Sequence, residues 1–206
     1  MKALLISTIL SLPVFLWGCP VASSRLYQPL DWEKPLLAES ERCIMPSDLQ
    51  AQPTAYYGKR LHWVGIIDSV IMYPQGENIR TTLLVNQKYY DYIEDFGAQR
   101  EKMFISPYGE GRFFFDKTFV AISLDSLKPI FSSGAKKGNL VFCYGTFSAL
   151  RDSIPVLESK GARFIPSEFF ATNIFSYRAE RDSLGNIIAG KDGFPKLTDF
   201  KILRIP

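Results

Sequence analysis

The strongest constraint on the fold is a series of short segments with strand character, separated by turns rich in glycine. Five such segments follow one another along the chain: Arg60–Met72, Thr81–Gln87, Arg112–Ile122, Leu140–Leu150 and Ile154–Ser159. They are rich in β-branched and aromatic residues, which favour strands. Pro129 limits any helix before the fourth segment to a short one. The chain is therefore expected to be mainly β.

Five short strands with glycine-rich turns predict a five-stranded Greek-key barrel of the OB type over residues 56–166, and a β-sandwich is the alternative. The first segment carries apolar residues on both parities, such as Trp63 on one and Ile66 on the other. Such a strand is expected to be central and covered on both faces. Gly65 in its interior predicts a bulge or a bend.

The regions on either side of the barrel are less regular. Residues 19–55 contain several prolines and lack a steady period, so they are predicted to form an irregular tether, with one short helical turn opened by Pro46. Residues 88–99 fit either a strand or a helix. Residues 167–206 predict a β-rich extension packed on the barrel, with a terminal strand over Thr198–Ile205.

The first 18 residues have the pattern of a secretory signal peptide. Lys2 precedes an apolar run from Ala3 to Leu16, which is shorter than the ~20 residues that a membrane span needs. Pro13 would also interrupt a spanning helix. We therefore expect residues 1–18 to be a signal peptide that is removed from the mature protein.

The end of this run, Leu16-Trp17-Gly18-Cys19, resembles the bacterial lipobox. The resemblance implies cleavage between Gly18 and Cys19 and acylation of Cys19. Two or more acyl chains give lasting attachment, so the membrane is an expected partner. Pro20 rather than aspartate follows the cysteine, which implies delivery to the outer membrane with the domain facing the periplasm.

Three further motifs, in order and with similar spacing, resemble the Slp-type family of starvation-inducible outer-membrane lipoproteins. They are Gly58–Ile67, Gly111–Phe113, and Leu124-Asp125 followed by Gly138–Thr146. The resemblance covers about residues 19–165. It implies a lipid-anchored envelope protein with no assigned reaction.

The two remaining cysteines, Cys43 and Cys143, lie in a chain that is expected to enter an oxidising compartment. A disulfide between them would close a long loop and contribute ~4 kcal/mol in the chain-entropy model. The alternative is a pair of thiols, with Cys143 buried as a small apolar residue. The sequence leaves both alternatives open, since it does not show the distance between the Cα atoms.

The composition argues against several functions. A formal net charge of +3 is too mild to suggest a nucleic-acid partner, so none is expected. His62 is the only histidine, and no nucleophile elbow or metal-ligand cluster is present. We expect His62 to be a packed polar side chain rather than a catalytic base. The sequence thus predicts a protein that is not an enzyme, without catalytic residues, metal or cofactor.

Aromatic residues supply the candidate ligand face, because OB barrels bind sugars and oligonucleotides by stacking on such rings. The candidates are Tyr89, Tyr90, Tyr92 and Phe114, with ordinary core packing as the preferred alternative. The predicted function is a non-enzymatic lipid-anchored protein that binds an envelope protein or polymer, or serves envelope integrity. The alternatives are a sugar- or oligonucleotide-binding module and an envelope hydrolase with an unrecognised site.

Overall fold

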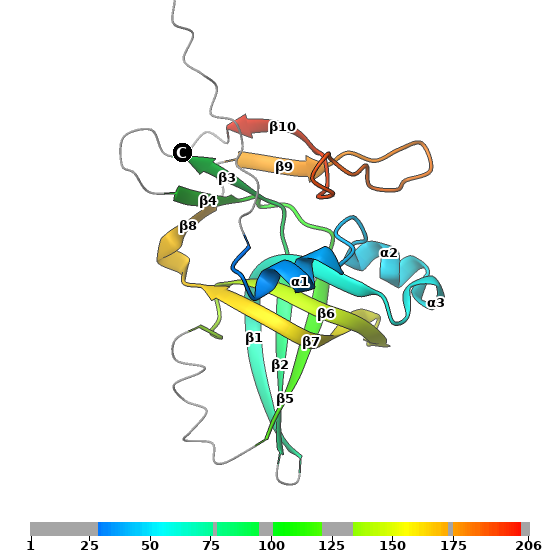
Figure 1. Ribbon diagram of the computed structural model, residues 1–206, viewed down its shortest axis with the longest axis vertical. Helices are drawn as coiled ribbons and strands as arrows, with labels where there is room; N and C mark the ends of the chain where they lie inside the picture. Colours follow the sequence, from blue (N-terminus) through cyan, green and yellow to red (C-terminus); the bar gives the residue numbers. More distant parts are fainter. Residues whose placement is uncertain (1–28, 76–77, 95–100, 121–133, 173–174, 203–206) are drawn as a thin grey trace, which may run out of the picture.

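The computed structural model describes residues 29–75, 78–94, 101–120, 134–172 and 175–202. Its centre is a closed barrel of five strands: β1 (Arg60–Gln75), β2 (Asn78–Gln87), β5 (Arg112–Val120), β6 (Leu140–Arg151) and β7 (Ile154–Ile165). Their order around the barrel is β1-β2-β5-β7-β6 (Figure 1). All neighbours are antiparallel except β5 and β7, which are parallel. The predicted OB-like barrel is confirmed, and the sandwich alternative is wrong.

Strand β1 closes the barrel because it pairs with two neighbours along its length. Its first half pairs with β6 and its second half with β2, and Gly65 is the point where both ladders meet. A Cβ at Gly65 would lie 2.3 Å from the carbonyl oxygen of Asn86, so only glycine allows this approach. The β1–β2 register shifts between Ile67 and Ser69, just after the predicted bend.

The barrel interior is the main core of the protein. Its inward side chains come from all five strands: Trp63, Leu83, Val85, Phe113, Phe115, Val141, Cys143, Phe147 and Leu157. The rings of Trp63 and Phe113 meet edge to face with their centroids 4.8 Å apart. Burial of each large apolar side chain contributes roughly 1.5–3 kcal/mol, so this interior is the main source of stability.

Residues 29–55 differ from the predicted irregular tether. They include most of three short helices: α1 (Glu33–Ala38), α2 (Pro46–Ala51) and α3 (Pro53–Tyr56). Pro46 and Pro53 start α2 and α3, positions where proline fits because no N–H is needed. Met45 and Leu49 pack into the main core. Tertiary burial therefore orders a segment that has no helical period, while the predicted turn at Pro46 is confirmed.

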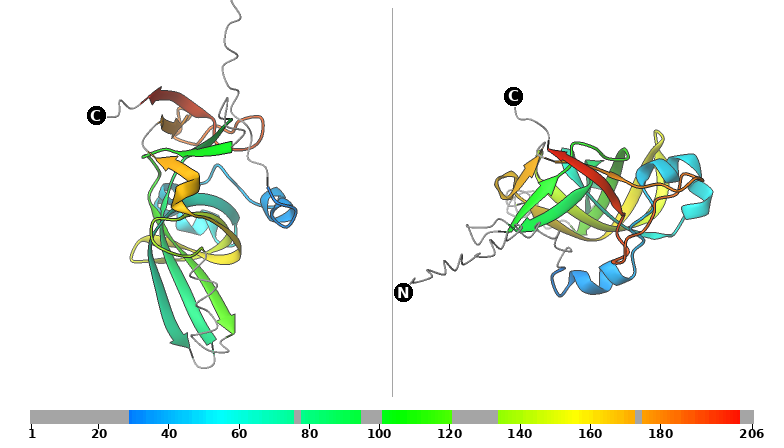
Figure 2. Two further views of the ribbon diagram at one scale, coloured as in Figure 1. Left: turned by 90° about the vertical axis from the view of Figure 1, so that its left-hand side faces the viewer. Right: turned by 90° about the horizontal axis from the view of Figure 1, so that it is seen from above.

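A second layer covers one end of the barrel (Figures 1 and 2). It contains a three-stranded sheet and a two-stranded sheet, built from β3 (Tyr90–Glu94), β4 (Glu101–Ile105), β8 (Phe170–Thr172), β9 (Phe175–Ala179) and β10 (Leu197–Ile202). A short 3-10 turn, Ser167–Phe169, precedes β8. The predicted β-rich extension is confirmed, and residues 90–94, which the sequence left open, form a strand.

The outer side of β1 and β6 packs against this second layer and α1. A second apolar cluster forms there from Leu37, Val64, Met103, Ile105, Leu140, Phe142 and Tyr144. Strands β1 and β6 are thus covered on both faces, as the two-sided apolar pattern of the first segment predicts. The fifth strand runs past its predicted end at Ser159 and continues through Gly161 to Ile165. A Cβ at Gly161 would meet Leu36 at 2.7 Å, so this glycine makes room for α1.

Candidate ligand-binding face

The outer side of β2 and β5 differs from that of β1 and β6 because it carries polar side chains. Leu83 and Val85 of β2 and Phe113 and Phe115 of β5 point into the core. Because side chains alternate along a strand, the residues between them point outward. The register makes four outward pairs: Arg80 with Thr118, Thr82 with Asp116, Leu84 with Phe114, and Asn86 with Arg112. We call these eight residues the β2–β5 face.

Asp116 is the centre of this face. Its side chain is only 4% exposed, and its carboxylate accepts hydrogen bonds from three side chains. Thr82 donates to Oδ1 at 2.6 Å, Arg151 donates to Oδ2 at 2.8 Å, and Arg80 also donates to Oδ2. Both guanidinium groups are therefore fixed in position by one buried carboxylate.

The two arginines remain open to solvent on their other sides. The side chains of Arg80 and Arg151 are 38% and 35% exposed. A guanidinium has five N–H donors, and the shared carboxylate uses few of them. Such a group binds carboxylates or phosphates in a bidentate manner. The arrangement can therefore bind an anion without first having to order its arginines.

An aromatic ring lies beside the cationic pair. The guanidinium carbon of Arg151 is 4.8 Å from the centre of the Phe114 ring, which is within the range of a cation–π contact. Phe114 is partly exposed. A stacking surface and a cationic group are thus adjacent on the same side of the barrel.

The turn between β6 and β7 forms the border of the face. It consists of Asp152 and Ser153, whose φ angles of 51° and 63° lie in the left-handed region. Two such residues in a two-residue loop make a tight hairpin whose twist matches that of the strands. Gln50 of α2 donates to the carbonyl oxygen of Ser153 at 2.9 Å. Arg151, directly before the turn, therefore extends from a well-defined support.

The other predicted ligand-face residues lie elsewhere. Tyr89 is buried in the core and donates to Glu110 Oε1 at 2.6 Å, and burial and this partner both raise its pKa. Tyr90 packs in the second apolar cluster against Phe142. The side chain of Tyr92 lies outside the described residues. Of the four candidates, the structure brings only Phe114 to the β2–β5 face.

His62 lies in a closed aromatic environment. Its ring stacks on Tyr144 at 4.5 Å between centroids and meets the edge of Phe194 at 6.0 Å. The pKa of His62 is lowered to about 3, chiefly by burial and to a smaller extent by the charge of Arg42, while a hydrogen bond with the backbone of Cys143 partly opposes the shift. The imidazole is neutral at pH 7 and enclosed by rings, as expected of a packed side chain.

Cys43 and Cys143 are both free thiols in the structure, so the disulfide alternative is not realised. Cys143 points into the main core, where burial raises its pKa well above the ordinary value. Cys43 is half-buried and donates to the carbonyl oxygen of Gly193 at 3.6 Å. Cys43 packs against the edge of the same core.

Among the residues that the structure describes, no three His, Cys, Asp or Glu side chains come together as metal ligands. No helix among them has the length and apolar character to cross a bilayer. Gly18 and Cys19, the predicted cleavage and acylation positions, lie outside the described residues.

The barrel topology defines this chain as an OB-like barrel protein, and its β2–β5 face carries arginines and an aromatic ring. Strands two and three of an OB barrel, with their bordering loops, are the elements that bind oligonucleotides and oligosaccharides. In this chain those strands are β2 and β5, and the bordering β6–β7 turn is the one that Arg151 precedes.

Comparison with known proteins gives matches in structure only. No family model and no curated protein matches the chain, so the Slp-type resemblance stays a prediction. A Klebsiella pneumoniae lipoprotein, described by its name as nucleic acid-binding, aligns with 68% of this chain and 100% of its own at 14% identity and a TM-score of 0.34. The protein PriB from Ralstonia solanacearum aligns with 50% of this chain and 94% of its own at 15% identity and a TM-score of 0.29.

One prediction about partners is wrong. The sequence led us to expect no nucleic acid, on the basis of a mild net charge and an envelope location. A structural neighbour is named as a nucleic acid-binding lipoprotein, which contradicts that expectation. The physical reason is that net charge averages over the whole surface, whereas binding depends on the local arrangement of charges.

Proposed function

We propose that this chain is a lipid-anchored, non-enzymatic binding protein of a bacterial envelope, and that the β2–β5 face holds a polymeric ligand. The observation that carries the proposal is the buried carboxylate of Asp116, which positions two partly exposed arginines on the ligand side of an OB barrel. Pre-positioned side chains reduce the ordering cost of binding. Structural stability alone does not require two guanidinium groups on one carboxylate.

The anchor is part of the same proposal. The lipobox-like Leu16–Cys19 segment supports cleavage after Gly18 and acylation of Cys19. The residue that follows, Pro20, favours the outer membrane, with the barrel facing the periplasm. Membership of the Slp-type lipoproteins would fit this location and is proposed on the three motifs alone.

The environment of the titratable groups supports a binding role over catalysis. The single histidine is neutral and enclosed by aromatic rings, so it has no access to a substrate proton. The carboxylate of Asp116 is occupied by three donors. General acid–base catalysis needs a titratable group within hydrogen-bond reach of the reacting atoms.

The anchor is tested by comparing the wild-type protein with Cys19→Ala, using Cys43→Ala as the control. Labelling with a radioactive or alkyne fatty acid is expected for the wild type and the control, and to be lost in Cys19→Ala, which should accumulate as the uncleaved precursor. Membrane fractionation should place the labelled forms with the outer membrane. Unchanged labelling and processing of Cys19→Ala would contradict the proposed anchor.

The binding role is tested with three soluble polymers: a single-stranded oligothymidylate, chondroitin sulfate and maltoheptaose. The acylated protein in detergent is titrated with each one, and its affinity is compared with that of Arg80→Ala. At least one polymer is expected to bind, and to bind more weakly to the variant. The absence of binding to all three, or binding that Arg80→Ala leaves unchanged, would contradict a ligand on this face.

A further inference from the structure

We infer that the β2–β5 face binds a single-stranded oligonucleotide, with phosphates at the arginines and a base on Phe114. The inference rests on the proposed binding function and names its ligand class. It follows from the juxtaposition of two fixed guanidinium groups with a partly exposed ring, since a nucleotide carries both a bidentate anion and a planar aromatic group. A neutral sugar lacks the anion, and an acidic polysaccharide lacks the flat ring.

Two adjacent arginines suit a phosphodiester better than cations scattered over a surface do. Arg80 and Arg151 share Oδ2 of Asp116, which places the two guanidinium groups next to each other. A phosphate between them can accept several charge-assisted N–H bonds, which are stronger than neutral ones. Asp116 offsets one positive charge, so the pair also stays ordered when no ligand is bound.

The apolar pair Leu84–Phe114 is the next outward pair after Thr82–Asp116 along the strands, and its ring lies 4.8 Å from the guanidinium carbon of Arg151. Leu84 and Phe114 are both partly exposed on an otherwise polar face. Base–aromatic stacking tolerates any sequence because every base has a π-face. The cationic site at Asp116 and the adjacent apolar pair thus match a phosphate and a neighbouring base of a single strand.

The face extends beyond this central site. Asn86 and Arg112 form the next pair, so the cations Arg80 and Arg112 lie on pairs about six residues apart, or about 20 Å at the usual rise of a strand. That length suits a few nucleotides of extended strand. On β7, the register partner of Asp116 is the exposed Glu158, which repels phosphates. The strand is therefore expected to follow β2 and β5 rather than cross β7.

The inference is tested by fluorescence anisotropy with a 5′-labelled fifteen-residue oligothymidylate and the acylated protein in detergent. Arg80→Ala and Arg151→Ala should each weaken binding about tenfold, because each removes a charge-assisted contact. Each should also reduce the slope of log affinity against log salt by about 0.7. Phe114→Ala should weaken binding about tenfold with little change in the salt slope.

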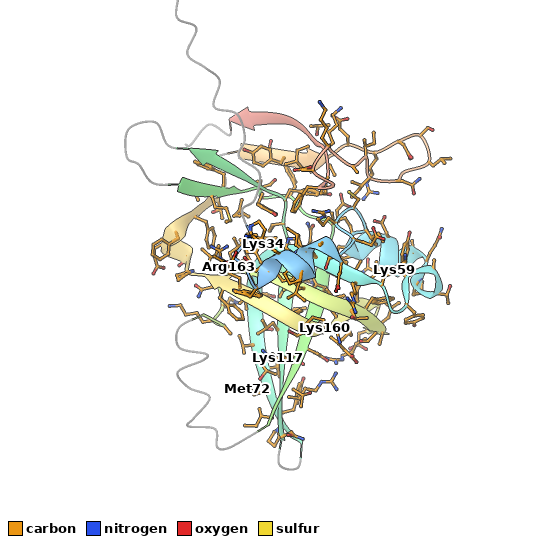
Figure 3. All side chains as sticks on the ribbon, viewed as in Figure 1. Lys34, Lys59, Met72, Lys117, Lys160 and Arg163 are labelled. Atoms are coloured by element: carbon orange, nitrogen blue, oxygen red, sulfur yellow. The ribbon has the colours of Figure 1, made fainter. Side chains whose placement is uncertain are left out.

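Two lysines provide controls for the loss of one positive charge. Lys117 lies on β5 directly after Asp116 and on the opposite face, and Lys34 lies on α1 (Figure 3). Lys117→Ala and Lys34→Ala are expected to change the affinity less than about twofold, because alternation directs Lys117 away from the face and Lys34 lies on a different element. Phe114→Tyr keeps an aromatic ring and should retain binding, which separates stacking from loss of structure. Each variant's melting temperature is measured alongside its affinity.

Several outcomes would overturn the inference. A duplex of the same length or chondroitin sulfate binding as tightly as the single strand would show that the face responds to charge alone. An equal loss of oligothymidylate affinity in Lys117→Ala and Arg80→Ala would also show that the protein responds to charge alone. Selective binding of chondroitin sulfate or maltoheptaose through Arg80 would overturn this inference while leaving the proposed binding function intact.

Discussion

The outer side of the barrel has two halves. Each contains a buried polar residue, but the side chains around the two residues differ in their exposure to solvent. On the β1–β6 half, His62 is covered by aromatic rings and by the second layer, and it is neutral. On the β2–β5 half, Asp116 is equally buried, yet the arginines that surround it reach solvent. One half is closed by packing, whereas the other keeps charged groups ordered at the surface.

The two halves differ in how readily a ligand can reach their polar groups. A ligand that reaches His62 would have to displace Phe194 and Tyr144, which pack around it. A ligand that reaches Arg80 or Arg151 displaces only water, because Asp116 already holds both side chains in place. Binding functions are found at pre-formed polar groups of this kind, which is why we place the proposed binding function on the β2–β5 half.

The largest expected effect is on the β2–β5 half. Asp116→Ala leaves two arginines and Thr82 without their common acceptor, so it should destabilise the protein by about 3 kcal/mol. This is the lower end of the range for a broken buried pair, because the arginines are partly solvated. Urea unfolding followed by tryptophan fluorescence measures the change. A loss below about 1 kcal/mol would show that Asp116 does not organise this half.

The next effect is on the β1–β6 half and appears only in acid. His62 has a pKa of about 3 when folded and an ordinary value of 6.5. Above pH 6.5 neither state binds the proton, and below it only the unfolded state does, so stability falls as the pH decreases towards 3. The loss is about 1.4 kcal/mol per pH unit, or about 2 kcal/mol at pH 5.

His62→Phe removes the titrating group and keeps a ring, so it isolates this effect. The difference in unfolding free energy between wild type and variant should be constant above pH 7 and should shift by about 2 kcal/mol in favour of the variant by pH 5. Urea unfolding at a series of pH values measures this difference. Titration of the carboxylates affects both proteins equally and cancels in it. Parallel curves for the two proteins would show that His62 is not sealed in its neutral form.

The distinction between the two halves is largely present in the sequence. Outward positions of the first strand segment include the apolar Val64 and Ile66, whereas those of the second include the polar Thr82 and Asn86. Alternation therefore predicts the barrel and which strands are covered twice. Gly65 predicts a bulge or a bend, because a glycine inside a strand indicates such a feature or a close approach of another backbone. The structure shows that close approach at Gly65 and a register shift shortly after it.

The arginine cluster could not be predicted in the same way. Arg80 and Arg151 lie 36 and 35 residues from Asp116, and their contact depends on strand register that periodicity does not give. The tyrosines at 89 and 90 were selected for their ring type alone, and both are packed. Only the turn at Pro46 was predicted in this region. Helix α1 escaped prediction because burial of Leu37, rather than a helical period, holds it in place.

The smallest expected effect concerns the turn that borders the β2–β5 face. Asp152 and Ser153 both have positive φ angles, which favour Asn and Gly in a two-residue hairpin. The double change Asp152→Asn with Ser153→Gly should raise the free energy of unfolding by about 0.5–1 kcal/mol, because it relieves backbone strain.

The same double variant also tests whether the side chains of the turn contact the ligand. The turn keeps its shape, and the carbonyl of residue 153 remains available to Gln50, so oligothymidylate affinity should stay within about twofold of wild type. Urea unfolding and anisotropy on the same preparation measure both quantities. A more stable protein with lost affinity would show that the Asp152 or Ser153 side chain itself contacts the ligand, which would extend the face onto the turn.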